Sequence, residues 1–255
     1  MIEIAARAYD VEGPVGAPTI VFIHGTRLSR SCWSGQVRDL GTTYRVMAVD
    51  LPGHGVLADV PFTLAGASDV VARAIREAAT DRRAVVVGLS LGGYVAMDLA
   101  ARVPALVRGL VLAGATQEPI GPAAIPYRAL AGALRRLDGP GLDALNAWFF
   151  RARYPAAIAD PIIEGGFFSR GGADALDSLI GERFRPRLAS YEGPVLLLNG
   201  QFDLLFRVGA PGFAAVAQDA RRVRLAGALH LVNLDRPAAF DAAVRGFVED
   251  LDDRP

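Results

Sequence analysis

The sequence predicts an α/β fold: a mostly parallel central sheet with helices on both faces, and a helical lid inserted after the sixth strand. Short runs of Val, Ile and Leu bounded by Gly, Pro or Asp recur along the 255 residues. Such runs are typical of strands buried on both faces of a parallel sheet. Stretches of helical length separate most of them, as in right-handed strand–helix–strand units. One long interval, 117–191, breaks this alternation.

Each element follows from its pattern, taken in chain order. The strands are continuous apolar runs, and the helices are the longer amphipathic stretches between or after them. The predicted strands are 19–24, 45–50, 84–88, 109–114, 194–199 and 222–225. The predicted helices are 68–79, 91–103, 212–219 and 237–251.

The interval 117–191 is predicted to be a helical lid. Leu142, Leu145, Trp148 and Phe149 place apolar groups on one face of a helix. The interval also holds nine of the 20 aromatic residues of the chain, and a structureless loop of this length is improbable in a compact domain. We therefore expect an α/β core formed by 1–116 and 192–255, with 117–191 as the lid.

Composition excludes several classes of function. All 27 basic residues are Arg, so Schiff-base chemistry and a phosphate-binding lysine are absent. Cys32 is the only cysteine, and the three histidines lie far apart in sequence, so we expect neither a metal site nor a cofactor. The 27 acidic residues cancel the basic ones, which gives no electrostatic case for nucleic acid. A small-molecule substrate is the expected partner, and the sequence leaves the oligomeric state open.

The sequence also predicts no membrane association. Met1-Ile2-Glu3-Ile4 is not a charged leader before a long apolar run, and no segment reaches about 18 uninterrupted apolar residues. We expect a cytoplasmic protein.

The strongest chemical signal is Gly88-Leu89-Ser90-Leu91-Gly92, between a predicted strand and a predicted helix. A serine in a sharp strand-to-helix turn needs neighbours without side chains, because the backbone brings the flanking positions close together. The turn would also place Ser90 at a helix amino terminus, where N–H groups stabilise developing negative charge. The alternative is a glycine-rich turn that happens to contain a serine. We predict that Ser90 is a nucleophile.

A serine nucleophile needs a base, and only His24, His54 and His230 are available. His230 lies just after the last predicted strand, at the same carboxyl edge of the sheet as Ser90. His24 ends the first predicted strand and His54 lies in a tight turn, so both are interpreted as structural histidines. His230 is therefore the predicted base.

The base needs an acid that fixes its tautomer. Asp203 lies four residues after the strand 194–199 and gives the chain order Ser90, Asp203, His230, which is the order of α/β-hydrolase triads. Glu118 and Asp50 also follow predicted strands and are the competing acids. A loop carboxylate that caps Arg207 is the alternative interpretation of Asp203.

With these residues in place, the chain resembles the α/β-hydrolase superfamily, in its lid-bearing, epoxide-hydrolase-like and bacterial esterase branch with a serine nucleophile. The resemblance covers nearly the whole length. It rests on the stretches Val21-Phe22-Ile23-His24-Gly25-Thr26, Val49-Asp50-Leu51-Pro52-Gly53-His54-Gly55, Gly88-Leu89-Ser90-Leu91-Gly92-Gly93, Asn199-Gly200-Gln201-Phe202-Asp203 and Leu234-Asp235-Arg236-Pro237 after His230.

The resemblance implies that the backbone N–H groups of Thr26 and Leu91 form the oxyanion hole. It also implies that 50–55 is a structural turn and that 117–191 is the lid. Haloalkane dehalogenases and epoxide hydrolases of this branch use an aspartate nucleophile, so Ser90 disfavours both activities. The oxyanion segment lacks the glycine run of many lipases. Arg27 in this segment faces solvent or binds a substrate carboxylate, and is taken as a candidate substrate-binding residue.

The predicted function is hydrolysis of a small or medium carboxylic ester, lactone or thioester through an acyl-enzyme on Ser90. Selectivity is expected in the lid, where Trp148, Phe149 and Phe150 are the candidate substrate-binding residues; packing of the lid on the core is the alternative role for them. Hydrolysis or lyase-type cleavage of a carbon–carbon bond on the same triad remains open, as does a perhydrolase side reaction. A non-catalytic ligand receptor on this fold is the third possibility.

Overall fold

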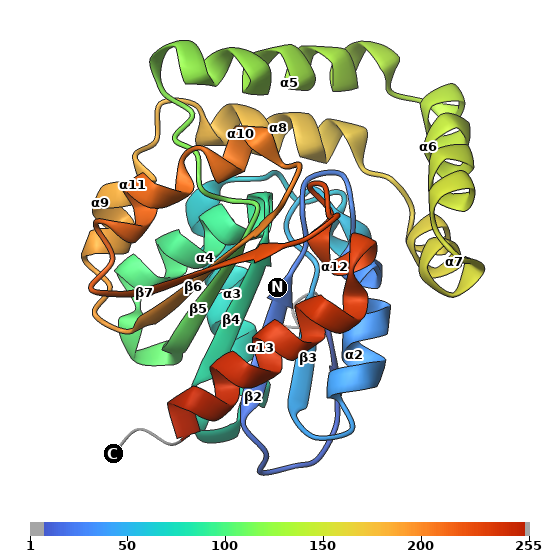
Figure 1. The fold of residues 1–255 in the computed structure, drawn as a ribbon. Helices are drawn as coiled ribbons and strands as arrows, with labels where there is room; N and C mark the ends of the chain where they lie inside the picture. The colour runs from blue at the N-terminus through green and yellow to red at the C-terminus, as the bar shows by residue number, and fades with distance from the viewer. Residues whose placement is uncertain (1–7, 253–255) are drawn as a thin grey trace.

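The central sheet of the computed structural model, which describes residues 8–252, has seven strands in the order β1-β3-β2-β4-β5-β6-β7. All neighbouring strands are parallel except β1, which runs antiparallel to β3 at one edge. The predicted fold class is therefore confirmed (Figure 1). The strands are β1 (Tyr9–Glu12), β2 (Thr19–Ile23), β3 (Arg45–Val49), β4 (Ala84–Leu89), β5 (Val107–Ala113), β6 (Pro194–Gly200) and β7 (Asp219–Leu225).

The central strands are apolar throughout because both of their faces are covered. Successive residues of β2 alternate between two cores: Val21 and Ile23 pack with α3 (Leu64–Ala78) and α4 (Leu91–Arg102). Ile20 and Phe22 pack on the other face, with α2 (Ser34–Leu40) and α13 (Pro237–Asp252). Helices on both faces thus fix β2, β4, β5 and β6 in the middle of the molecule, and their carboxyl ends form one common edge.

The interval between β5 and β6 is helical, as predicted. After a 3-10 turn (Gly121–Ala124) it forms α5 (Ile125–Leu137), α6 (Pro140–Arg153), α7 (Ala156–Gly165), α8 (Ser169–Leu179) and α9 (Phe184–Ala189). In Figure 1, α5 and α8 cross the top of the molecule above the sheet, and α6 and α7 descend at one side. We call residues 117–191 the insertion.

The position of the insertion in the strand count corrects the sequence prediction. It follows β5, the fifth strand of the described residues, and not a sixth strand. Only four predicted strands precede residue 117, and the structure adds β1 to them.

Contacts at the carboxyl end of the insertion join it to its own first residues and to the core. Glu118 Oε1 accepts hydrogen bonds from the backbone N–H groups of Phe184 (3.1 Å) and Arg185 (2.9 Å), and Arg185 Nη2 donates to Glu118 Oε2 (2.8 Å). Arg187 of α9 pairs with the buried Asp98 of α4 (3.1 Å). These contacts tie the two ends of the insertion together and hold α9 against α4, the helix that begins after Ser90.

Several predicted boundaries were wrong. The predicted helix 212–219 is α11 (Ala210–Ala214), and β7 already begins at Asp219. The short helices α10 (Leu204–Arg207) and α12 (Val232–Asp235) were not predicted, because a single turn leaves no periodic pattern. No helix in the described part of the chain is long and apolar enough to cross a membrane. Met1–Ile4, on which the prediction of a cytoplasmic protein also depends, lies outside the described residues.

Candidate active site

Ser90 occupies a strained turn between β4 and α4. Its backbone has φ 51° and ψ −113°, a conformation that costs about 1–3 kcal/mol for a residue with a side chain. A Cβ atom at Gly88 would collide with the backbone of Gly92, and one at Gly92 would collide with the backbone of Ile23. The structure therefore requires glycine at both flanking positions, for the reason that the sequence predicted.

Ser90 is also held by its own main chain. Its N–H donates to Ala113 O of the neighbouring strand (2.8 Å), and its carbonyl accepts from Gly93 N (2.9 Å). The contacts fix the Cα–Cβ direction, so the hydroxyl lies at the amino terminus of α4. The first N–H groups of a helix lack intrahelical acceptors, and Leu91 supplies the first of them here.

Asp203 and His230 form a hydrogen-bonded pair. His230 Nδ1 donates to Asp203 Oδ2 at 2.8 Å, and the Asp203 side chain is 5% exposed whereas that of His230 is 36% exposed. The Phe206 ring stacks on the imidazole, with 4.7 Å between ring centroids and 22° between planes. Gly114 (φ 58°) leaves room for the pair, since a Cβ there would lie 2.9 Å from His230 Cε1 and 3.2 Å from Asp203 Oδ2. Asp203, the Phe206 ring and the backbone at Gly114 therefore hold the imidazole in place. Nε2 is the ring nitrogen that is not bonded to Asp203.

One cavity of about 350 Å³ brings the predicted residues together. Ser90, Asp203 and His230 line it, and so do Thr26 and Leu91, the residues predicted to form the oxyanion hole. The rest of its wall is mainly apolar and comes from α4, from the loop and helix after β6, and from α5 and α8 of the insertion. These lining residues are Tyr94, Pro126, Tyr127, Leu130, Leu176, Leu179, Leu205 and Phe206.

Tyr94 and Tyr127 are lining residues that the sequence analysis missed. Tyr94 OH donates to Gln117 O (2.7 Å), and the two phenol oxygens lie 2.7 Å apart. Burial raises the pKa of Tyr127 to about 12 and that of Tyr94 well above its usual value, so both are neutral. Because the single proton of Tyr94 is used on Gln117, Tyr127 donates to Tyr94 and offers the cavity no free donor. The position of Tyr94 one helical turn after Ser90 was the signal available in the sequence.

The predicted substrate contacts of Trp148, Phe149 and Phe150 are corrected by the structure. None of the three lines the cavity. All lie on α6, where Trp148 is 65% and Phe149 45% exposed, whereas Phe150 is buried and stacks on Phe167 with ring centroids 5.6 Å apart. α6 descends at the side of the molecule, whereas α5 and α8 cross above the sheet (Figure 1). Phe150 packs in the core, which is the alternative role considered for these residues.

Arg27 lies next to Thr26, although it is not among the residues that line the cavity. It adopts a left-handed backbone conformation with φ 67°. Its side chain is partly buried, and its Nε atom has no hydrogen-bond partner among the described residues. Burial lowers the pKa of its guanidinium, opposed by the negative charge of Asp143. The structure thus places Arg27 beside the candidate oxyanion hole, under α8, and not on the cavity wall.

His24 and His54 are buried in the core. Burial lowers the pKa of His24 to about 4 and that of His54 to about 3, so both are neutral. His24 Nδ1 donates to Gly25 O (2.8 Å), and its Nε2 accepts from Leu51 N (3.0 Å). Both ring nitrogens of His54 are likewise bonded to backbone atoms. Neither ring lines the cavity, which agrees with their interpretation as structural histidines.

The two competing acids have other partners. Asp50 is buried and accepts from Arg30 N (2.8 Å) and Val56 N (3.1 Å). Glu118 binds the start of α9; burial raises its pKa, but the hydrogen bonds from Arg185 outweigh this and lower it. Of the three candidates, only Asp203 reaches His230.

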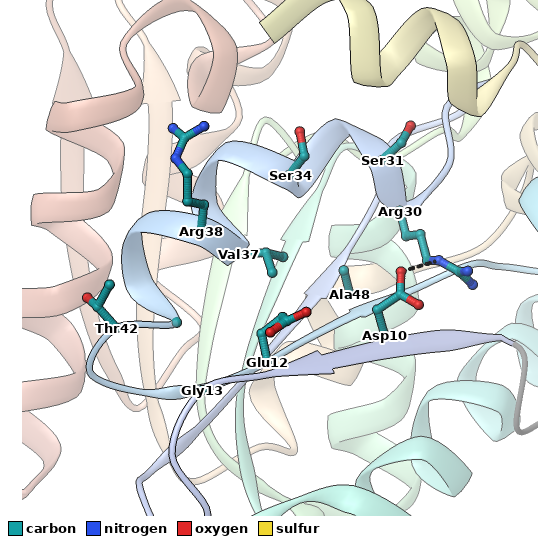
Figure 2. A pocket seen from close by; sticks show the side chains of 11 residues that line it. Asp10, Glu12, Gly13, Arg30, Ser31, Ser34, Val37, Arg38, Thr42 and Ala48 are labelled. Carbon is teal, nitrogen blue, oxygen red and sulfur yellow. Dashed lines mark ion pairs between the residues drawn. The ribbon is translucent and has the colours of Figure 1, made fainter. Parts of the chain in front are cut away.

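A second hollow lies between β1 and α2, on a part of the surface that Ser90 does not reach. Figure 2 shows its lining, including Ser31, Ser34 and Arg38, with an ion pair between Arg30 Nε and Asp10 Oδ2 (2.7 Å). Its volume is about 600 Å³, larger than that of the Ser90 cavity, but no histidine lines it. Within residues 8–252, no group of three His, Cys, Asp or Glu side chains is arranged to hold a metal ion.

Comparison with known proteins places this chain in a family. Residues 20–243 match the model of the alpha/beta hydrolase family. A pimeloyl-[acyl-carrier protein] methyl ester esterase from Neisseria meningitidis serogroup B is 32% identical over 259 residues, covering 92% of this chain and 95% of the relative. A similar esterase from Nitrosospira multiformis is 26% identical, with 93% and 97% covered.

Solved structures agree with the fold. A hydrolase from Pseudomonas aeruginosa superposes with a TM-score of 0.77 at 28% identity, covering 94% of this chain and 93% of that one. A thermophilic esterase from Thermogutta terrifontis gives a TM-score of 0.78 at 23% identity, covering 96% and 93%. Among the relatives that the chain matches are carboxylic ester hydrolases, and the chain belongs to the alpha/beta hydrolase family.

Proposed function

We propose that this protein hydrolyses a small or medium carboxylic ester, including lactones and thioesters, through an acyl-enzyme on Ser90. The observation that carries the proposal is the shared cavity. It contains a serine on a strained strand-to-helix turn and a histidine whose Nδ1 is bonded to a buried carboxylate at 2.8 Å. Nucleophile, base and orienting acid are the three parts that acyl transfer to water requires.

In this mechanism Ser90 Oγ attacks the carbonyl carbon, while His230 Nε2 accepts the hydroxyl proton. The carbonyl oxygen becomes an oxyanion, which the backbone N–H groups of Thr26 and Leu91 stabilise. Collapse of the tetrahedral intermediate breaks the bond to the alcohol, and His230 returns the proton to the leaving oxygen. Asp203 keeps the proton of the neutral imidazole on Nδ1 and stabilises the imidazolium.

Water then repeats the sequence on the acyl-enzyme. His230 takes a proton from the attacking water, and the carboxylic acid leaves as Ser90 Oγ recovers its proton. Every proton that moves is carried by His230, so the mechanism requires neither a metal nor a cofactor.

The cavity supports an apolar substrate of limited size. At roughly 30 Å³ per non-hydrogen atom, the volume of one liquid water, about 350 Å³ encloses on the order of a dozen such atoms. Leu130, Leu176, Leu179 and Leu205 form much of its wall, and no Arg among residues 8–252 lines it. An uncharged aliphatic ester is therefore favoured over one that carries a second carboxylate near the reacting carbonyl.

The relatives suggest the same class. They are named as methyl ester esterases, which act on an ester with a small alcohol. We propose that this chain also cleaves a short-alcohol ester of an aliphatic acid. Residues 117–191 would serve as the lid of a core formed by 1–116 and 192–255, because α5 and α8 supply five of the residues that line the cavity.

The experiment is a substrate panel measured with the wild type beside Ser90→Ala. The panel holds methyl and ethyl esters of acids from two to ten carbons, a lactone, a thioester and a β-diketone. We expect turnover of short-alcohol esters by the wild type and loss of it in Ser90→Ala. Cleavage of the diketone alone would favour carbon–carbon bond hydrolysis, and ligand binding without turnover of any member would favour a receptor.

A further inference from the structure

We infer that α8 of the insertion positions the oxyanion donors, with Gly172 and the Thr26 hydroxyl as positioning groups. This inference rests on the proposed function and assigns a role to contacts that lie outside the triad. The segment concerned, Gly25 to Leu28, follows β2 and contains Thr26, whose N–H is aimed at the reacting carbonyl oxygen in the proposed mechanism. We call it the oxyanion loop.

Two hydrogen bonds tie the oxyanion loop to the insertion. Thr26 Oγ1 donates to Gly172 O of α8 (3.2 Å). Phe168 N, immediately before α8, donates to Arg27 O (2.9 Å). Thr26 and Arg27 are thus bonded to residues more than 140 positions later in the chain.

The backbone of α8 also packs directly on the core at this point. A Cβ at Gly172 would lie 2.7 Å from Arg27 Cγ and 3.0 Å from Thr26 Oγ1. A Cβ at the neighbouring Gly171 would collide with the backbone of Gly53 in the turn after β3. Adjacent glycines therefore allow α8 to approach two core loops more closely than any other residue would permit.

The opposite side of the oxyanion loop is held by a histidine. His54 Nε2 accepts from Arg27 N at 3.2 Å, and His54 Nδ1 donates to Pro52 O at 2.9 Å. The ring can accept because burial keeps it neutral, with its pKa lowered to about 3. Arg27 is thereby bonded through its N–H to the core and through its carbonyl to the insertion.

The loop needs these contacts because Arg27 is in the left-handed region, with φ 67°. A residue with a side chain adopts this conformation only where its surroundings impose it. If α8 moved away, the peptide groups on either side of Arg27 would turn and the Thr26 hydroxyl would lose its acceptor. The preceding Gly25–Thr26 peptide, which carries the Thr26 N–H, would then lose its direction. Stabilisation of the oxyanion would fall while binding of the apolar part of the substrate, which touches other residues, would remain.

The test compares two Gly→Ala variants in the insertion. Gly172→Ala introduces the Cβ that meets the oxyanion loop, and Gly132→Ala on α5 is the matched control, since no atom lies within 4 Å of its Cβ position. Removal of one oxyanion donor costs about 10²–10³ in turnover, and a misdirected donor should cost part of this. We expect Gly172→Ala to lose 10-fold to 100-fold in kcat on the best ester, with KM within about twofold. Gly132→Ala should retain the wild-type values.

A transition-state analogue separates positioning from general destabilisation. The inhibition constant of an alkyl trifluoromethyl ketone, whose adduct with Ser90 carries the oxyanion, should rise in parallel with the loss in kcat. Thr26→Val keeps the backbone N–H and removes only the hydroxyl donor, so it should show a smaller loss in kcat and a smaller rise in the inhibition constant. This variant decides the question if Gly172→Ala does not fold.

The inference is overturned if Gly172→Ala matches Gly132→Ala in kcat and in analogue affinity, or if Thr26→Val leaves both unchanged. It is also overturned if KM rises while kcat stays constant. If the wild type shows no ester turnover that is lost in Ser90→Ala, the proposed function is refuted instead.

Discussion

Replacement of Asp203 by Asn changes one oxygen of the triad to nitrogen while the shape of the side chain stays the same. The carboxylate accepts the Nδ1–H of His230 at 2.8 Å and is 5% exposed, so water cannot substitute for it. An amide whose NH₂ group faces Nδ1 would move the imidazole proton to Nε2, where it blocks acceptance of the Ser90 proton. In serine proteases the equivalent change costs about 10⁴ in turnover, which corresponds to roughly 5.5 kcal/mol of activation free energy.

The assay is kcat on the best ester from the panel, with circular dichroism and the melting temperature as measures of folding. We expect Asp203→Asn to lose up to about 10⁴ in kcat and to keep its fold. Glu118→Gln is the control, because Glu118 binds Phe184 and Arg185 and not His230. It should lower the melting temperature while kcat changes by no more than about threefold. A larger loss of kcat in Glu118→Gln than in Asp203→Asn would refute the assignment of the acid.

Four further outcomes follow from the same structure. Trp148→Ala and Phe149→Ala should leave the ratio of kcat/KM between short and long acyl esters within about twofold of the wild-type ratio, because both side chains are exposed away from the cavity. Phe150→Ala should lower the free energy of unfolding, measured with urea, by roughly 3 kcal/mol because its side chain is buried. Burial raises the pKa of Asp241 to about 6 from about 3.8 when unfolded, so its charge destabilises the fold above pH 6. Asp241→Asn should therefore add roughly 1–3 kcal/mol at pH 8, and the gain should vanish as the pH falls towards 4. EDTA should leave ester turnover unchanged, and a loss that zinc restores would contradict the metal-free mechanism.

The parts of the fold that the sequence predicted are those whose signal is local. The strands from β2 to β6 are continuous apolar runs between Gly, Pro and Asp, and the turn at Ser90 requires its two glycines for steric reasons. β1 escaped prediction because Tyr9–Glu12 is short and half-buried on one side only, and its pairing with β3 depends on residues 34 or more positions away. The start of β7 was placed late because Asp219 and Arg221 are exposed at the edge of the sheet.

Part of the site could be predicted, because residues that directly follow parallel strands gather at one edge of the sheet. Ser90, Asp203 and His230 each come just after a strand, and parallel strands end at one edge, so their meeting in one cavity could be expected. The opposite wall of this cavity could not be predicted, because it depends on which face of each insertion helix turns inward. Trp148 and Phe149 are apolar like the lining residues of α5, yet α6 presents them to solvent. Tyr127 and Leu130 of α5 line the cavity with Ser90 instead.

The contact between Gly172 and Thr26 was beyond sequence reasoning for a related cause. Glycine inside a helix indicates close packing without naming the partner. Only the placement of α8 over the sheet identifies the oxyanion loop as that partner.

Covalent labelling of Ser90 tests the central claim most directly. The wild type is incubated with a small alkyl fluorophosphonate, and the modified residue is located by intact-protein mass and peptide mapping. We predict a single adduct on Ser90, its formation slowed strongly in His230→Ala and abolished in Ser90→Ala. An adduct on another residue, or an unmodified wild type that still hydrolyses esters, would contradict the claim that catalysis proceeds through Ser90.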